Sequence, residues 1–415
     1  MKYRLLISFA IFCLFPTFVP ANAQSNLKSA PILRLLSFVP DAPKFRQYLS
    51  YGDLDAWYAG WAIPRIKDRK EWLQLNDQRV NYIPLWNIIM PRQTVLPEIL
   101  GSNFLNADDM AAFYGFSVFN ANRWLQAGQP PDLITAVDIT DNPSQVATAL
   151  TNAGYTTEKL SNDATLYSLR KDYELDLNNT KIPHVGMLPG LNRIALNDKT
   201  LIISAATNNI SDAWQAHTSN TSLKENSTYV AAIKALDDPA LAKMGQLVGV
   251  ILMDSSTLRT ANSCPPRISK ETCQTLMKRL VGTEEPSQSL PDYNLAAFAT
   301  FHEAGATHLV LTLVFPKGTA TNGVADALKA RLQNYVSVVT RQPFLERLHK
   351  FGGDLDFAVS SEANKLPVVI VGLHQPDPRE PNASNSVRPA VVNWADMVNQ
   401  RDLLFLFRTP SDVAK

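Results

Sequence analysis

The sequence predicts an α+β protein, with antiparallel sheets built from hairpins and flanking helices. Strand-like runs come in pairs joined by tight Asn-Asp turns, as in residues 157–169 and 193–205. Well-capped helical runs follow in groups instead of alternating regularly with strands. No regular spacing of similar residues indicates a sequence repeat, but the two halves of the chain contain groups of helices, strands and hairpins of similar size. We therefore expect two α/β modules, residues 24–242 and 243–415, the first opening with a helical aromatic region over 40–130.

The first residues predict a signal peptide. Lys2 and Arg4 precede an apolar run, and Ala21 and Ala23 give the small-x-small pattern that a signal peptidase recognises. We therefore expect residues 1–23 to be removed on export. Export places the mature protein in the periplasm or outside the cell.

Charge and hydropathy argue against nucleic acid as a partner and against a transmembrane segment. The formal net charge of +1 becomes −1 once Lys2 and Arg4 are removed, which argues against a protein built to hold nucleic acid. No later apolar run reaches the roughly 18 residues that a membrane-spanning helix requires, so we expect no transmembrane segment in the mature chain. Cys13 follows Phe12 inside the apolar core, where lipidation would require a small residue. The expected partner is an unknown envelope protein or a small ligand.

The aromatic region opens with a strand and a helix. The stretch YLSYGDLDAWYAGW predicts a short strand near 48–51 and then a helix with Asp53 as its N-cap. One face of that helix is formed by Leu54, Trp57, Tyr58 and Trp61. The stripe has two interpretations: it packs on the rest of the protein, or it forms an aromatic platform for a sugar. Exposed Trp57 and Trp61 would favour the platform.

The remainder of the first module predicts helices, a strand and two hairpins. The clearest helix lies in DNPSQVATALTNAGY, where Asn142 is the N-cap and Gly154 ends the helix. The other expected elements are helices over 106–115, 120–128, 210–217 and 227–238, a strand over 133–139, and the hairpins 157–169 and 193–205.

The second module has its own order of elements. QLVGVILM predicts a buried strand, and Ser269 is the expected N-cap of a helix over 270–281. The other expected elements are hairpins over 294–316 and 355–373, the second turning near Asn364, helices over 323–339 and 393–400, and a last strand over 403–407.

Two cysteines remain after the predicted processing. Cys264 and Cys273 lie nine positions apart, and an oxidising compartment favours a disulfide between them. Such a bridge would pin the start of the 270–281 helix to the preceding Pro-Pro loop. The alternative is a reduced pair, with Cys273 packed beside apolar neighbours on that helix.

The stretch HEAGATH, which holds His302, Glu303 and His308, offers possible metal ligands. A metalloprotease helix needs two histidines four positions apart, whereas these are six apart and Gly305 interrupts any helix. On a hairpin that turns at Ala304-Gly305 the two imidazoles could approach each other, but a closed zinc site would still lack a ligand. We therefore expect solvated histidines at the rim of the hairpin, and no metal or other cofactor.

The remaining candidates for catalysis are dispersed. Asp138 and Asp141 flank a strand end, with Asp138 expected on the solvent face and Asp141 in the turn before the next helix. Asp354 and Asp356 lack the glycine and closing glutamate of a calcium loop. The other histidines are scattered at His184, His217, His349 and His374. No nucleophile elbow, Walker loop or dinucleotide fingerprint occurs, so no catalytic residue is assigned.

Several short sequence segments occur in an order that is also found in a group of other proteins. LLSFVPDAP, YGDLDAWYAG, PPDLITAVDITDNPSQVATALTNAGY, ATLYSL and SLKENSTYVAAIKAL span roughly residues 31 to 250. Through these stretches, taken together, the chain resembles a diffuse group of uncharacterised bacterial exported proteins, many of them predicted lipoproteins. It departs from many members by lacking a lipidation cysteine. The resemblance implies a bacterial envelope protein and assigns no activity.

The leading hypothesis is an exported envelope protein that binds a ligand or partner without catalysis. A second hypothesis is a hydrolase whose site is assembled from dispersed Asp, Glu and His residues, because such sites need no local motif. A third is carbohydrate binding by the N-terminal aromatic side chains.

Overall fold

The computed structural model describes most of the chain outside the predicted signal peptide. The described residues are 27–60, 64–77, 97–101, 107–161, 163–176, 189–260, 268–281, 290–303, 306–350, 352–376 and 393–407. The predicted signal sequence, residues 1–23, lies outside them, as does the proline-rich stretch 377–390.

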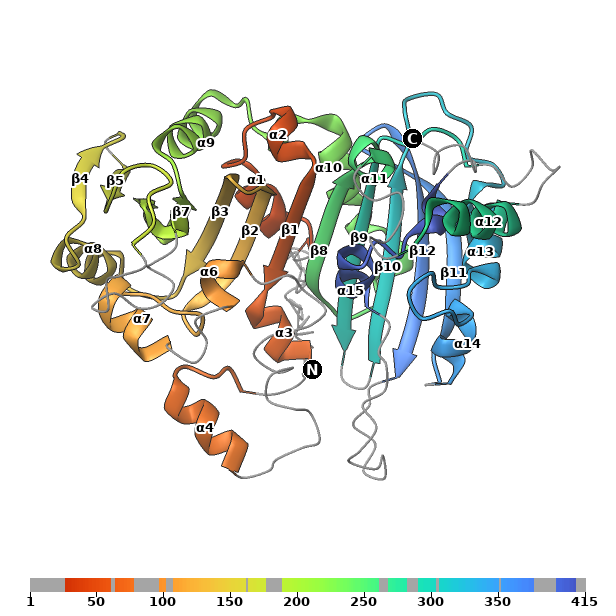
Figure 1. Ribbon diagram of the computed structural model, residues 1–415, viewed down its shortest axis with the longest axis horizontal. Coiled ribbons are helices and arrows are strands. Elements are labelled where there is room, and N and C mark those ends of the chain that lie inside the picture. The colour runs from red at the N-terminus through yellow and green to blue at the C-terminus, as the bar shows by residue number, and fades with distance from the viewer. Residues whose placement is uncertain are drawn as a thin grey trace, which may run out of the picture.

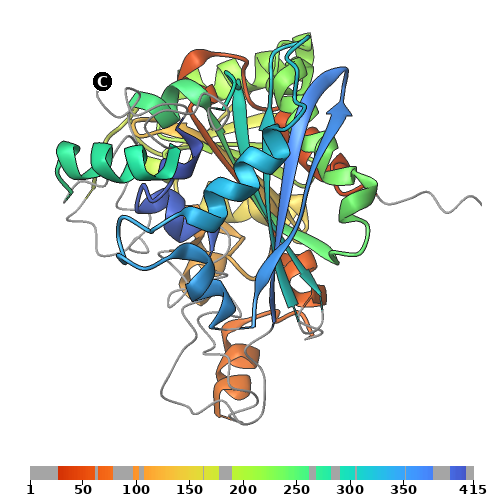
Figure 2. The same cartoon turned by 90° about the vertical axis from the view of Figure 1, so that its right-hand side faces the viewer.

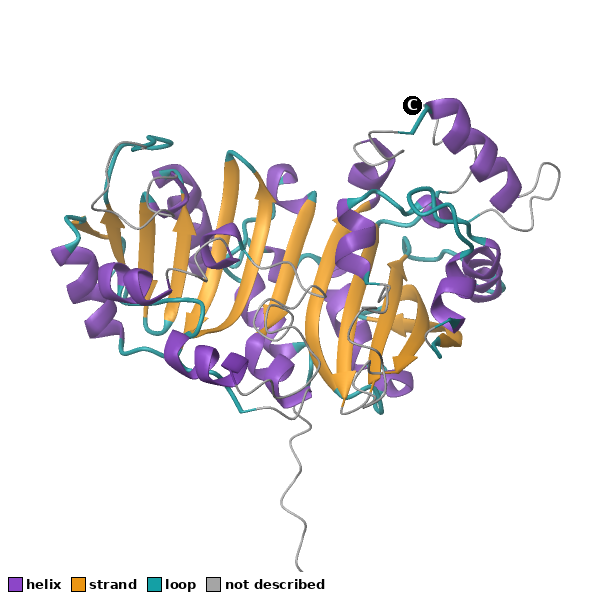
Figure 3. Cartoon of the chain, turned by 60° about the horizontal axis from the view of Figure 1, so that its bottom comes forward, coloured by secondary structure: helices purple, strands orange, loops and turns teal. Residues whose placement is uncertain are grey.

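The predicted α+β class is confirmed, and the hairpins join into one antiparallel sheet of twelve strands (Figures 1 and 3). Its strand order is β11-β12-β10-β9-β8-β1-β2-β3-β7-β6-β5-β4. The strands are β1 (Tyr48–Asp53), β2 (Ala121–Gln129), β3 (Asp132–Ile139), β4 (Thr156–Lys159), β5 (Thr165–Ser168), β6 (Arg193–Asn197), β7 (Thr200–Ser204), β8 (Gln246–Asp254), β9 (Leu295–Glu303), β10 (Ala306–Val314), β11 (Asp354–Ala363) and β12 (Leu366–Pro376).

Helices cover both faces of this sheet (Figure 2). The α-helices are α1 (Ala30–Leu36), α2 (Pro43–Arg46), α3 (Leu54–Gly60), α4 (Arg69–Asp77), α6 (Glu98–Gly101), α7 (Ala107–Tyr114), α8 (Pro143–Asn152), α9 (Thr207–Ser219), α10 (Ser227–Lys234), α11 (Ser255–Thr260), α12 (Lys270–Val281), α13 (Val324–Asn334), α14 (Phe344–His349) and α15 (Trp394–Asn399). Short 3-10 helices are η3 (Pro189–Leu191), η4 (Leu223–Glu225), η5 (Ala235–Asp237), η6 (Pro239–Leu241) and η8 (Leu404–Leu406). Within the described part of the chain, no helix has the length and apolarity needed to cross a bilayer.

The core is divided by the sheet. One apolar cluster runs along one face of both halves and lies under α1, α9 and α10, with Leu49 and Val310 as members. The opposite face carries two clusters. The one over the first half includes Trp57 and Trp124, and the one over the second half includes Phe298 and Trp394. Because successive residues of a strand point to opposite faces, strands such as β9 and β10 are buried on both sides.

The two halves follow the same order around the central pair β1 and β8. Each of these strands ends in an aspartate that caps the next helix: Asp53 Oδ1 accepts from Ala56 N at 2.9 Å, and Asp254 Oδ1 accepts from Thr257 N at 2.6 Å. In both halves a hairpin is followed by helix, and the last strand of the half, β7 or β12, pairs back onto the first hairpin; the first half has the additional hairpin β4–β5. The two halves therefore share part of their strand order, and the division at residues 242 and 243 stays a prediction.

Most local predictions are confirmed. Asn142 caps α8 by accepting from Ser144 N at 3.0 Å, and Gly154 follows that helix with φ +92°. Asp198 and Asn364 lie at the predicted hairpin turns with positive φ, which short polar side chains tolerate. Ser269 Oγ accepts from Thr272 N at the start of α12.

Two local predictions are wrong. Residues 120–128 were expected to be helical, but they form most of β2, which pairs with β1 and β3. Trp124 and Leu125 are buried on opposite faces, so the segment lacks the polar alternation that marks a half-exposed strand. Residues 403–407 hold the short 3-10 helix η8 instead of a strand. The buried Arg331 guanidinium donates to the carbonyl oxygens of Phe405 and Phe407.

Candidate functional site

The stretch HEAGATH lies where β9 ends and β10 begins, with residues 304 and 305 outside the described part of the chain. The expectation of solvated rim histidines is wrong, because His302 and His308 are both buried. In the antiparallel register Thr307 faces His302, and Phe301 faces His308. The two imidazoles therefore point to opposite faces of the sheet and cannot share one ligand.

His302 belongs to the core of its face. Its Nδ1 lies 3.0 Å from Thr307 Oγ1, and its ring stacks on Trp57 with centroids 5.8 Å apart. A side chain on Gly60 would come within 3.0 Å of His302, so the glycine allows α3 to approach β9. The packing interpretation of the aromatic stripe is confirmed for Trp57, which is buried and offers no platform to a sugar. Trp61 lies outside the described residues.

His308 meets ionisable side chains from three other strands. Glu303 is on β9, Asp356 on β11 and His374 on β12, directly opposite His308 in the register. We call Glu303, His308, Asp356 and His374 the strand-end cluster, since they gather where β9 and β12 end and β10 and β11 begin (Figure 1). The His308 side chain is 9% exposed, whereas Asp356 is 38% and Glu303 44% exposed, so the cluster opens to solvent on its acidic side.

Hydrogen bonding fixes the tautomer of the central imidazole in its neutral form. His308 Nε2 lies 3.1 Å from Glu303 Oε1. Because a carboxylate only accepts, the proton of the neutral imidazole lies on Nε2 and the lone pair on Nδ1. That Nδ1 forms no hydrogen bond with any described residue, and the closest carboxylate, Asp356 Oδ2, is 3.8 Å away. One ligand atom each from His308, Asp356 and His374 lie within 4.8 Å of one another.

A β-bulge brings Asp356 into the cluster. The pairing of β11 with β12 shifts between Leu355 and Phe357, which leaves Asp356 as the extra residue. Leu355 packs in the core of one face, and Phe357 packs against the core of the other. Gly372 provides the room, since a Cβ there would lie 2.3 Å from the Phe357 ring.

The sequence singled out Asp356 and His374 separately, as an incomplete calcium loop and a scattered histidine, and gave no sign that they join His308. A hairpin that turns at Asn364 brings these two residues near each other, so that part of the cluster could have been predicted. The position of β12 beside β10 is a long-range pairing that no local pattern encodes.

A serine–histidine pair elsewhere resembles part of a hydrolase site. Ser37 Oγ is 2.9 Å from His217 Nδ1 and donates to the carbonyl oxygen of Arg34 at 2.7 Å. Because the single hydroxyl proton goes to that carbonyl, His217 Nδ1 must donate to Ser37 and cannot take its proton. Burial, together with the positive charge of Lys224, lowers the pKa of His217, and Phe38 stacks on its ring. The pair therefore fastens the end of α1 to α9.

The carboxylates at the end of β3 also have structural partners. Asp138 was expected on the solvent face, but it is buried; it pairs with Arg34 and accepts from Thr200 Oγ1 at 3.0 Å. Asp141 accepts from Asn120 Nδ2 at 2.9 Å, which ties the turn before α8 to the residue preceding β2. Burial raises the pKa of Asp141.

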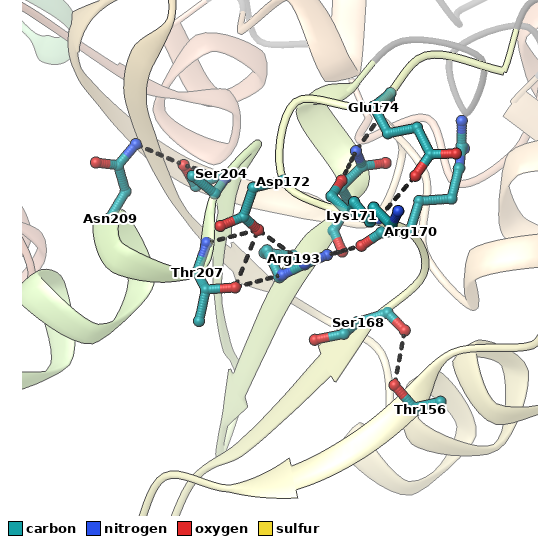
Figure 4. A network of polar contacts seen from close by, with 12 residues as sticks. Thr156, Ser168, Arg170, Lys171, Asp172, Glu174, Arg193, Ser204, Thr207 and Asn209 are labelled. Atoms are coloured by element: carbon teal, nitrogen blue, oxygen red, sulfur yellow. Dashed lines mark hydrogen bonds and ion pairs between the residues drawn. The ribbon is translucent and has the colours of Figure 1, made fainter.

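A second polar network lies near the other end of the sheet (Figure 4). The nearly buried Arg193 pairs with Asp172 at 2.7 Å and donates from Nε to Thr207 Oγ1 at 2.7 Å. Asp172 also accepts from Thr207 N at 3.0 Å. These contacts hold the loop after β5 against the start of α9, so we assign the network to stability.

Cys273 is buried in α12, beside Met277. Cys264 lies outside the described residues, so the Cys264–Cys273 disulfide stays a prediction.

Comparisons with known proteins give little guidance. No family model matches the chain, and no curated protein matches it. Crystal form III of TP0453 aligns with a TM-score of 0.35 at 7% identity, covering 83% of this chain and 94% of that chain. Crystal form I of TP0453 aligns with a TM-score of 0.31 at 7% identity, covering 81% and 91%. These scores are too low to establish a shared topology.

Proposed function

We propose that this protein is an exported bacterial envelope protein that acts by binding a small ligand at the strand-end cluster, without catalysing a reaction. The observation that carries the proposal is the buried His308 Nδ1, which has no hydrogen-bond partner among the described residues and faces Asp356 and His374. A buried polar atom without a partner costs about 1–3 kcal/mol. A ligand that engages this nitrogen would recover that free energy.

Binding is favoured over hydrolysis by the state of the candidate nucleophile. The Ser37 hydroxyl proton is committed to a backbone carbonyl, and His217 donates to the serine instead of accepting from it. The strand-end cluster itself contributes two imidazoles and two carboxylates, which are groups that hold ions and polar ligands.

The export part of the proposal rests on the N-terminal pattern of Lys2, Arg4, Ala21 and Ala23 and on the resemblance to exported proteins. Expressed in a bacterium, the full chain should appear outside the cytoplasm with a mass that corresponds to a start at Gln24. Deletion of residues 1–23 should leave it in the cytoplasm. Cytoplasmic protein that retains its first residues would contradict export and leave the binding proposal untouched.

The binding part is tested by thermal unfolding against a panel of cations, anions, amino acids and sugars. A ligand that binds only the folded protein raises its stability in proportion to ln(1 + [L]/Kd). At least one compound should raise the melting temperature of the wild type and of His349→Ala, but not of His374→Ala. No shift with any compound, or an equal shift in both variants, would remove the proposed site.

A further inference from the structure

We infer that the strand-end cluster binds a divalent transition metal ion, with Zn²⁺ as the probe, through the imidazoles of His308 and His374 and the carboxylate of Asp356. This inference rests on the proposed function and names the ligand class for the same site. It assigns Glu303 as the residue that orients His308.

Glu303 orients His308 for coordination. Metal-binding histidines commonly donate their other ring N–H to a carboxylate, which fixes the tautomer and makes the coordinating nitrogen more basic. His308 Nε2 and Glu303 Oε1, 3.1 Å apart, have this arrangement. The lone pair of Nδ1 is thereby directed away from Glu303. The side chain is only 9% exposed, so its packing holds this orientation.

The three ligand atoms lie close enough together to reach one ion after small side-chain movements. Zinc bonds of 2.0–2.2 Å in a tetrahedron place ligand atoms about 3.4 Å apart. In the strand-end cluster the three atoms lie within 4.8 Å of one another, so each pair must close by no more than about 1.4 Å. Asp356 is 38% exposed and sits on a bulge, and His374 is half-buried, so rotation of these two side chains can supply the movement.

The chemical types of the three ligands select the type of ion. Calcium and magnesium prefer six or more oxygen ligands, whereas two imidazole nitrogens and one carboxylate suit zinc and its neighbours in the first transition series. Three protein ligands also leave at least one position for water or a ligand from solution. The strand-end cluster is open on its acidic side, where such a ligand would enter.

The surface pair His349 and Asp354 supplies a matched control. His349 Nε2 lies 3.1 Å from Asp354 Oδ1, and both side chains are more than half exposed. This pair has the same two residue types, with His349 at the end of α14 and Asp354 at the start of β11. It is not among the groups of three potential ligands formed by the described residues.

The test is calorimetric titration of purified, tag-free protein with zinc, calcium and magnesium chlorides. We expect one equivalent of zinc to bind and neither calcium nor magnesium to compete. Glu303→Gln should weaken zinc binding about 10- to 100-fold, the usual effect of losing an orienting partner. His374→Ala and Asp356→Asn should weaken it at least as much, while His349→Ala should bind like the wild type. Cobalt(II) bound to the wild type should show an absorption spectrum with nitrogen ligation that disappears in His374→Ala.

Each outcome decides between the two proposals. Circular dichroism of every variant separates lost binding from lost folding, and both His374 and Asp356 are accessible enough to replace without opening the core. Zinc binding that survives both His374→Ala and Asp356→Asn would overturn the assignment of these ligands. If zinc does not bind but another compound of the thermal-unfolding panel binds in a His374-dependent way, the metal inference is wrong and the proposed function stands. If nothing binds, both are wrong and the cluster is a structural histidine–carboxylate group.

Discussion

Above about pH 10 we expect the protein to unfold cooperatively, because the folded state opposes ionisation of its buried tyrosines. Burial is the main cause that raises the pKa of Tyr48 to about 12. Burial likewise raises the pKa of Tyr51, Tyr58, Tyr114, Tyr155, Tyr229 and Tyr335. Since the folded pKa values exceed the unfolded ones, this contribution to stability is complete below pH 10 and is lost as the pH rises towards the folded values.

The size of the effect follows from the number of tyrosines. Each pKa unit corresponds to about 1.4 kcal/mol, so every pH unit above 10 removes roughly that free energy of folding per protected tyrosine. Seven such tyrosines would exhaust a typical total stability of about 5–15 kcal/mol within one to two pH units. Tyrosinate absorbance and far-ultraviolet circular dichroism, followed together against pH, should therefore change in one coincident transition.

Tyr114 provides the matched control. It is fully buried, and its hydroxyl forms no hydrogen bond with the described residues. Tyr114→Phe should therefore retain neutral-pH stability while shifting the alkaline transition to higher pH. Ionisation of all tyrosines near pH 10 with the fold retained would show that the buried hydroxyls reach solvent, contrary to this structure.

Asp402→Ala should destabilise the protein by about 3–5 kcal/mol. Asp402 is 3% exposed, and its carboxylate accepts from Tyr335 Oη, from Ser337 Oγ at 2.6 Å and from Val338 N at 2.8 Å. Alanine would leave three buried donors without an acceptor, each costing about 1–3 kcal/mol. The carboxylate joins the segment after α15 to the connection between α13 and α14. Its loss should therefore weaken the packing of residues 403–407 against the rest of the protein.

The measurement is urea unfolding of the variants, with stability taken from the transition midpoint and slope. Tyr335→Phe is the graded control, because it removes one donor and leaves the carboxylate two others; it should cost about 1–2 kcal/mol. Asp402→Asn keeps the shape with one carbonyl oxygen and should fall between the two. A loss of less than about 1 kcal/mol in Asp402→Ala would mean that solvent replaces the carboxylate at this position.

Sequence patterns predicted the elements whose signals are local. The N-cap and following proline of α8, the cap at Asp53 and the turns at Asp198 and Asn364 depend on residues within a few positions of one another. The same reasoning failed for β2, because a strand buried on both faces loses the alternation that identifies strands. It also failed for η8, where the distant side chain of Arg331 donates to the carbonyl oxygen of Phe405.

Part of the strand-end cluster could also be predicted from local sequence, and part could not. His302, Glu303 and His308 were singled out from their spacing alone, and their placement on one hairpin followed from the turn between the apolar runs. The expectation that the two histidines are solvated rim residues was wrong, because both are buried. Trp57 of α3 stacks on His302, and β12 lies beside His308.

By itself the sequence determined the class of fold, the hairpins and capped helices, and the N-terminal pattern from which export is proposed. These features depend on backbone preferences and on charge within short segments, so they can be read along the chain. Only the tertiary structure decided that β12 lies beside β10, that Asp356 joins the cluster through a bulge, and that His302 is separated from His308. Such contacts arise when sheet pairing and burial are satisfied for the whole molecule at once, and no short stretch of residues specifies that solution.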